Sequence, residues 1–248
     1  MAQKLSQHLF TDKQVIISPT RHFLPAIQLC LINLFKILDQ RSDVYLVIID
    51  NNSSEHIKSY LRSLDHPQAI KIFLPDNIGK ARATNQFISE HFDPQALPST
   101  IWSIDPDIIV DLNSFNYLTD AIINMPDDIK VLSPRYKKNG FNAEMNLYFP
   151  ARNILGKNGK KYNISFPFLC CVAGGALTMT GKTMRDLFDF RFFPTDQYQL
   201  YGNDDTAIFH YLRKKHLKSG YLNGTEVTHL RSADRISNEL QQYIDNPA

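Results

Sequence analysis

Cysteine is scarce in this sequence. The chain has three cysteines, Cys30, Cys170 and Cys171, and the last two stand side by side within an apolar run. Their spacing resembles neither a disulfide framework nor a zinc-binding motif. We therefore expect a protein of a reducing compartment.

Long apolar stretches are missing as well. No run of about 18 apolar residues that could span a bilayer is present, and residues 1–11 lack the apolar segment of a secretory signal peptide. We expect a cytoplasmic protein. A basic cluster of Arg213, Lys214, Lys215 and Lys218 usually marks a solvated helix face, but it is also compatible with peripheral contact with anionic lipid at the inner face of the membrane.

The chain has no excess of one charge. It contains 27 Lys and Arg residues against 25 Asp and Glu residues, a formal net charge of +2 over 248 residues. Without a basic surplus it lacks the electrostatic signature of a nucleic-acid-binding protein, so no nucleic-acid partner is expected. A hydrophobic share of 43% and a charged share of 21% are typical of a globular protein. This length fits one α/β domain.

Short apolar runs alternate with helical patterns in the first half of the chain. Four runs predict strands at 15–17, 45–49, 70–74 and 101–104, and apolar residues spaced by three or four predict helices between them. Such alternation indicates βαβ units and a mainly parallel sheet flanked by helices. Ligands of such sheets bind beyond the carboxyl ends of the strands.

The pattern weakens after residue 133. Residues 135–165 are rich in Lys, Asn and Gly, and we expect an irregular segment that closes over a bound substrate. Extended structure is expected again at 168–172 and 177–180, followed by helices at 182–188 and 206–215. Residues 233–248 are expected to form a loosely held tail.

Two carboxylates follow the fourth predicted strand. Asp105 and Asp107 stand two residues apart, directly after the apolar run 101–104. Mg²⁺ and Mn²⁺ prefer oxygen ligands and commonly bind through one or two carboxylates together with substrate phosphates. The pair is therefore a candidate cation site. An Asp-Pro turn that merely ends a strand would have the same sequence.

A second acidic pair, Asp204 and Asp205, precedes the helix predicted at 206–215. One carboxylate can cap this helix while the other accepts a proton from a substrate hydroxyl. Alternatively, both only stabilise the helix N-terminus. His229 ends a short extended run, from which its imidazole could complete a metal site, although an isolated histidine more often has a structural or surface role.

In this order, six segments resemble motifs of the family 2 glycosyltransferases. These segments are Val15–Arg21, Ile49–Ser54, Asn77–Asn85, Asp105–Asp107, Gly202–Asp205 and Val227–His229. The resemblance extends over most of the chain and implies a single GT-A domain over residues 1–248. Residues of about 12–133 would form a Rossmann-like nucleotide-sugar-binding half and residues of about 134–232 an acceptor-binding and catalytic half.

The resemblance also implies roles for individual residues. Those that would border the base and ribose of a nucleotide are Pro19, Thr20, Arg21, Asp50 and Asn52. Those that would lie near the nucleotide and its phosphates, or shape the donor and acceptor pocket, are Asn77, Lys80, Gly174 and Gly175. Asp105 would contact the ribose or the metal, Asp107 would be the principal metal ligand of a DxD motif, and His229 would add a ligand to the metal or the diphosphate.

Two acidic residues would carry the catalysis. Asp205 would be the general base, and Asp204 would orient the acceptor; a shift of one position in the correspondence would exchange these roles. The chain departs from the common pattern of relatives in two places. It has Asp204 where a Glu is frequent, and Arg21 and His22 where a Tyr-Asn type of pair is frequent.

The implied reaction is an inverting transfer of a hexosyl or N-acetylhexosaminyl group. The donor would be a nucleoside-diphosphate sugar, with UDP as the default nucleotide, and the acceptor a hydroxyl of a glycan or glycolipid in polysaccharide biosynthesis. Mn²⁺ or Mg²⁺ would assist. Two alternatives stay open: a haloacid-dehalogenase-type phosphohydrolase, in which Asp105 would be phosphorylated, and a catalytically inactive nucleotide-sugar-binding protein.

Overall fold

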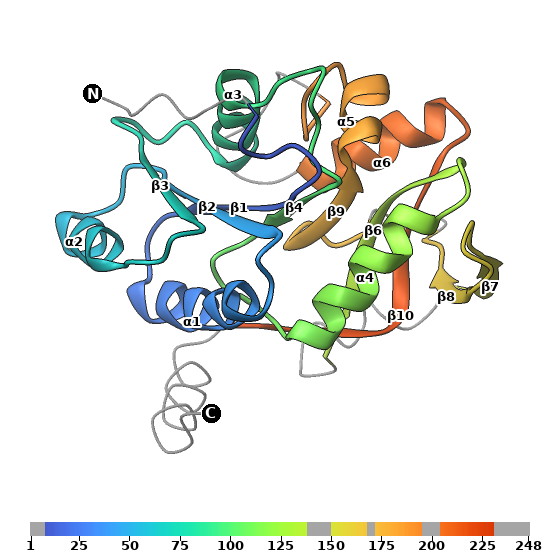
Figure 1. Ribbon diagram of the computed structural model, residues 1–248, viewed down its shortest axis with the longest axis horizontal. Coiled ribbons are helices and arrows are strands. Elements are labelled where there is room, and N and C mark those ends of the chain that lie inside the picture. Colours follow the sequence, from blue (N-terminus) through green and yellow to red (C-terminus); the bar gives the residue numbers. More distant parts are fainter. Residues whose placement is uncertain (1–7, 138–149, 168–171, 195–203, 231–248) are drawn as a thin grey trace.

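A ten-stranded sheet runs through the chain in the computed structural model (Figure 1), which describes residues 8–137, 150–167, 172–194 and 204–230. The strands are β1 (Gln14–Thr20), β2 (Val44–Asp50), β3 (Ala69–Phe73), β4 (Thr100–Ile104), β5 (Ile108–Val110), β6 (Ile129–Tyr136), β7 (Ala151–Leu155), β8 (Lys161–Ser165), β9 (Ala176–Thr180) and β10 (Lys218–His229). The helices are α1 (Leu24–Gln40), α2 (Glu55–Ser63), α3 (Lys80–His91), α4 (Leu112–Asn124), α5 (Gly181–Phe188) and α6 (Asp204–Lys214).

The first half of the chain folds as a parallel α/β unit. Strands β3, β2, β1 and β4 lie side by side in this order and all run in the same direction. Every residue of β1 and β4 is buried, because helices cover the sheet on both faces. The predicted α/β class and its mainly parallel core are therefore confirmed. Parallel strands end at the same edge, so the loops that follow β1, β2 and β4 gather there.

The second half of the chain extends the same sheet. Strand β9 lies antiparallel between β4 and β6, and β6 pairs in parallel with β10. Ile104 at the end of β4 is the register partner of Ala176 at the start of β9. This pairing sets the segment before β9 against the residues that follow β4.

The prediction of an irregular segment at 135–165 is wrong for its described part. Strand β6 continues to Tyr136, and β7 and β8 form an antiparallel hairpin in which β7 is the outermost strand of the sheet. Tyr162 and Ile164 are buried while Lys161 is exposed, so the polar residues taken as loop signals occupy outward positions of a strand. Residues 138–149, the expected strand residues 168–171 and the expected tail 233–248 lie outside the described residues.

Helix α4 and the short strand β5 are elements that the sequence patterns did not predict. The Asp111 side chain caps α4 by accepting a hydrogen bond from the Ser114 backbone N–H at 2.8 Å. Phe115 and Leu118 lie on its buried face, and the Phe115 ring stacks on Trp102 of β4 with 4.9 Å between centroids. Asn and Thr residues interrupt the apolar pattern of this segment, so its sequence did not predict a helix.

None of the helices in the described part of the chain is long and apolar enough to cross a bilayer.

Candidate active site

Asp107 and His229 meet at the carboxyl edge of the sheet. Asp105–Asp107 form a tight turn between β4 and β5, in which the Ile108 backbone N–H donates to the Asp105 carbonyl at 3.1 Å. Strand β5 then pairs antiparallel with the end of β10, with Ile108 opposite His229. This register brings His229 Nε2 to 3.0 Å from Asp107 Oδ2, and the Leu230 N–H donates to the Asp107 carbonyl at 2.8 Å.

The donor atoms of this pair suit a divalent cation. The Asp107 side chain is 34% exposed and the His229 side chain 14% exposed, so the carboxylate stays accessible to a ligand. A carboxylate oxygen and an imidazole nitrogen together fit Mn²⁺, while Mg²⁺ relies more on oxygen ligands. Within the described residues, no group of three or more His, Cys, Asp and Glu side chains is arranged to hold a metal ion. A cation at this pair would therefore take further ligands from substrate phosphates or water.

Asp105 pairs with Lys80. The Lys80 ammonium, at the start of α3, lies 2.6 Å from Asp105 Oδ1 and donates to the Gly174 carbonyl at 2.7 Å. Burial raises the pKa of Asp105 above its ordinary value, and the nearby Lys80 charge offsets part of that rise. Lys80 thus ties three segments together: the start of α3, the turn after β4 and the segment before β9.

Asp205 is hydrogen-bonded to the segment before β9. Its Oδ2 accepts a hydrogen bond from the Gly174 backbone N–H at 3.1 Å, and its Oδ1 accepts one from the Thr206 N–H at 2.7 Å. A Cβ at Gly174 would lie 3.1 Å from the Asp205 Cβ, so only glycine allows this close approach without a shift. The side chain of Asp204 lies outside the described residues.

Gly175 is also closely surrounded. Its carbonyl accepts a hydrogen bond from the Asp105 N–H at 2.8 Å. A Cβ at this position would lie 2.7 Å from the Tyr136 hydroxyl and 2.9 Å from Ile108 Cδ1. Glycine therefore lets the start of β9 pack against the turn that carries Asp105 and Asp107.

The candidate nucleotide loops are held mainly by their own side chains. Asp50 is fully buried at the end of β2, and its carboxylate accepts from the Ser53 N–H at 3.2 Å. Thr20, at the end of β1, is buried and donates to the Ile49 carbonyl at 3.3 Å. Pro19 lies beside it within buried β1, and Arg21 follows directly. These residues lie at or directly after the carboxyl ends of β1 and β2, where the sequence predicts a ligand to bind.

The loops after β2 and β3 are joined by an asparagine that sequence reasoning missed. Asn51 Oδ1 accepts from the Ile78 N–H at 3.0 Å, which links the loop after β2 to the turn before α3. Asn77 stabilises this turn by accepting from the Gly79 N–H at 3.2 Å. Asn52 lies in a left-handed conformation with φ 58°, and its side chain accepts from Lys58 at 3.2 Å. Asn51 stands in a run of polar residues, where nothing distinguishes it from its neighbours.

Two tyrosines near the site were also missed. The Tyr221 hydroxyl of β10 accepts from the Ala173 N–H at 2.7 Å and so holds the segment that leads to Gly174. Tyr136, at the end of β6, lies edge-on to the His229 ring with 6.0 Å between centroids, and burial raises its pKa well above the ordinary value. Its position at the end of a parallel strand is a signal that could have identified it.

The sequence of this chain also matches a known protein family. The family model described as Glycosyl transferase family 2 matches residues 16–178. This range includes Lys80, Asp105, Asp107 and Gly174, whereas Asp205 and His229 lie beyond it and are brought to the same edge by the fold. No curated protein sequence matches the chain.

Solved structures share the architecture at low sequence identity. A mannosyltransferase, PcManGT from Pyrobaculum calidifontis in complex with GDP-Man and Mn²⁺, has a TM-score of 0.63 and 16% identity, covering 96% of this chain and 66% of its own. GalNAc-T7 with UDP, GalNAc and Mn²⁺ has a TM-score of 0.60 and 12% identity, covering 94% of this chain and 48% of its own. TarS from S. aureus has a TM-score of 0.53 and 16% identity, covering 94% of this chain and 40% of its own.

These similarities establish the fold. The chain spans roughly two fifths to two thirds of the length of the three solved proteins, and at such identities the likeness extends to the GT-A architecture alone. The family model, by contrast, matches more than half of this chain in sequence. The chain belongs to glycosyl transferase family 2.

Proposed function

We propose that this protein is an inverting glycosyltransferase that moves a sugar from a nucleoside-diphosphate sugar to a hydroxyl of a glycan or glycolipid. The observation that carries the proposal is the Asp107–His229 pair, whose side chains lie 3.0 Å apart although they are 122 residues apart in the sequence. Lys80, Asp105 and Asp205 lie on the segments that adjoin this pair. One ammonium group, three carboxylates and one imidazole therefore lie along one edge of the sheet.

The donor would lie across the parallel half of the sheet, whose crevice beyond the carboxyl ends of the strands is the usual position for a nucleotide. The loops after β1 and β2, with Thr20, Arg21, Asp50 and Asn52, would border the base and ribose. Asn77 and Lys80 at the start of α3 would approach the phosphates, where an ammonium group offsets negative charge. UDP is the nucleotide we propose. The two similar structures with bound ligands contain UDP in one case and GDP-Man in the other.

Asp107 and His229 would hold Mn²⁺ or Mg²⁺ together with diphosphate oxygens. A divalent cation bound there would supply positive charge next to the diphosphate of the donor. Asp105, bound to Lys80, would orient the ribose or add to the negative charge that favours a cation. His229 is the least exposed of these three side chains, at 14%, and water therefore screens it less than the two carboxylates.

Asp205 would accept the proton of the attacking hydroxyl. Hydrogen bonds from Gly174 and Thr206 fix its carboxylate, and a fixed acceptor within hydrogen-bond reach is what general-base catalysis requires. Attack from the side opposite the diphosphate would invert the anomeric configuration. Asp204, the preceding residue, would orient the acceptor.

The transferred group would be a hexose or an N-acetylhexosamine. Residues of about 12–133 would bind the nucleotide sugar, and residues of about 134–232 would bind the acceptor and contribute the base. We propose a cytoplasmic role in polysaccharide or glycolipid synthesis, with peripheral contact at the inner face of the membrane through the basic cluster that begins at Arg213.

The test is release of nucleoside diphosphate from UDP-, GDP- and dTDP-sugars in the presence of Mn²⁺ and a panel of glycan acceptors. We expect acceptor-dependent release from one donor, and a loss of about 100-fold or more in kcat for Asp205→Asn. The exposed Asp127→Asn serves as the matched control. The anomeric configuration of the product, read by NMR, tests inversion, and a retained configuration would contradict the proposed mechanism.

A further inference from the structure

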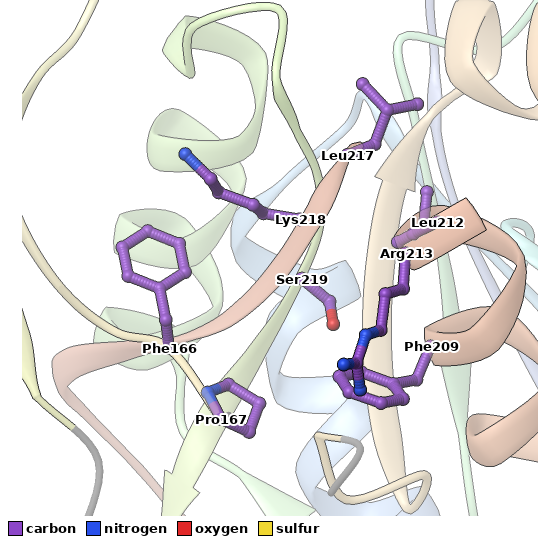
Figure 2. Close-up of a pocket in the computed structure, with 8 residues that line it drawn as sticks. All are labelled: Phe166, Pro167, Phe209, Leu212, Arg213, Leu217, Lys218 and Ser219. Atoms are coloured by element: carbon purple, nitrogen blue, oxygen red, sulfur yellow. The ribbon is translucent and has the colours of Figure 1, made fainter. Parts of the chain in front are cut away.

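A cavity of about 190 Å³ lies between α6, the start of β10 and the residues that follow β8 (Figure 2). It is separate from the Asp107–His229 pair. Arg213, on its rim, is eight residues beyond Asp205 on α6, a distance of about 12 Å along a helix. Ser219, in its wall, stands at the start of β10, whereas His229 stands at the end of that strand.

The walls of this cavity are apolar. Phe166 and Pro167 line one side, and Phe209, Leu212 and Leu217 line the other. Apolar cavities of roughly 150 Å³ accept a benzene ring, so this one has room for a six-membered ring or a short alkyl chain. A sugar fits it poorly, because a sugar carries a hydroxyl on nearly every carbon and these walls offer few hydrogen-bond partners.

Ser219 contributes a hydroxyl that lacks a partner. The residue is 6% exposed, and its Oγ makes no hydrogen bond within the described part of the chain. Figure 2 shows this oxygen pointing into the cavity, toward the space between Pro167 and the Arg213 and Phe209 side chains. Buried polar groups are nearly always hydrogen-bonded in native proteins, so a buried hydroxyl without a partner at a cavity wall marks a position where a ligand can supply one.

Arg213 contributes a guanidinium group. Among the described residues, no carboxylate lies within ion-pair distance of it, whereas Lys218 on the same rim is paired with Asp128 at 2.6 Å and lies over the Phe166 ring. A guanidinium group presents parallel N–H donors that match a carboxylate or phosphate. The cavity therefore combines apolar walls with one guanidinium and one hydroxyl donor.

We propose that this cavity binds a small amphipathic oxyanion, a carboxylate or phosphate monoester with an apolar body the size of one ring. The apolar body lies between Phe166, Pro167 and Phe209, and the oxyanion accepts hydrogen bonds from Arg213 and Ser219. None of the lining residues is Lys80, Asp105, Asp107, Asp205 or His229, so binding in this cavity can be tested without altering the residues proposed for sugar transfer.

The experiment is a protein-observed NMR titration of the full chain with benzoate and with phenyl phosphate. Acetate, which lacks the apolar body, and benzyl alcohol, which lacks the charge, are the control ligands. The variants are Arg213→Gln and Ser219→Ala. Lys214→Gln is the matched control, because it removes the neighbouring cation of the same helix without altering the lining of the cavity.

We expect saturable binding of benzoate or phenyl phosphate, with the largest amide shifts at the end of α6 and the start of β10. Arg213→Gln should weaken this binding about tenfold or more, and Ser219→Ala about three- to tenfold, as expected for a charged and a neutral hydrogen bond. Ser219→Ala should leave the unfolding stability unchanged or raise it. Tighter binding of benzoate would identify a carboxylate as the head group, and tighter binding of phenyl phosphate a phosphate.

Three results would overturn the proposal. The first is equal binding of benzyl alcohol. The second is that Lys214→Gln weakens ligand binding as much as Arg213→Gln does, which would show that binding depends only on the surface charge of α6. The third is absence of saturable binding of both benzoate and phenyl phosphate, whether or not the protein binds phosphatidylserine vesicles.

Discussion

Lys80 is the residue that connects most parts of the candidate site. Its ammonium contacts both the Asp105 carboxylate and the Gly174 carbonyl, and Gly174 in turn donates to Asp205. Three consecutive contacts therefore link Asp105 to Asp205 through Lys80 and Gly174. We therefore expect a substitution at Lys80 or Gly174 to alter the positions of residues that it does not contact directly.

Lys80→Gln should destabilise the protein through Asp105. The variant removes the cation from a carboxylate that is largely buried, which should cost roughly 1–3 kcal/mol of unfolding free energy. Urea unfolding measures this cost. The double variant with Asp105→Asn should lose less than the sum of the two single variants, because the unpaired charge is then gone. Strict additivity would indicate that the two side chains do not interact in solution.

Gly174→Ala should impair catalysis more than donor binding. The added methyl would lie 3.1 to 3.2 Å from three atoms of the Asp205 side chain, so this carboxylate must move. Displacing a base by a fraction of an ångström should lower kcat about 10- to 100-fold. Steady-state kinetics would separate kcat from the KM for the donor, and UDP binding by calorimetry is the control. Unchanged kcat would argue against Asp205 as the base.

At the level of elements, the parallel half of the fold could be predicted from sequence and much of the rest could not. Fully buried strands such as β1 and β4 give continuous apolar runs, and helices with a clear apolar stripe such as α1 lie between them. Helix α4 has a buried face too, but Asn113 and Asn116 break its pattern. Hairpin β7–β8 was missed because its outward residues are the Lys and Asn typical of loops.

Asp111→Ala tests how far one side chain secures α4. Asp111 accepts from the Ser114 N–H at 2.8 Å and from the Ser114 hydroxyl at 2.9 Å. Loss of this N-cap should lower the unfolding free energy by about 1 kcal/mol. Chemical denaturation provides the value, with exposed Asp127→Ala as the comparison. Equal effects of the two changes would show that the cap contributes nothing specific.

The contacts of the candidate site depend on pairings between distant segments. The sequence indicated that Asp50, Asn77 and Asp105 follow strands of one parallel sheet, and such residues share an edge. It did not indicate that β5 would pair with β10, which brings His229 to Asp107, or that β9 would lie beside β4. These antiparallel pairings leave no local pattern, so which side chains touch could not be predicted.

At the scale of the whole molecule, metal removal should abolish activity but leave the fold intact. Asp107 and His229 are the two protein ligands that we propose, and the core of the described residues does not depend on them. Treatment with EDTA should therefore stop sugar transfer, and Mn²⁺ should restore it. The thermal unfolding midpoint should change little, as followed by circular dichroism. Full activity in EDTA would contradict the metal-assisted mechanism.

Metal-dependent nucleotide binding at Asp107 is tested most directly by calorimetry with UDP, GDP and dTDP, with and without Mn²⁺, on the intact protein and on Asp107→Ala. We predict that one nucleotide binds in a Mn²⁺-dependent manner and that Asp107→Ala weakens this binding about tenfold or more, as expected for the loss of a metal ligand or its close partner. No binding of any of the three nucleotides, with or without Mn²⁺, would contradict it.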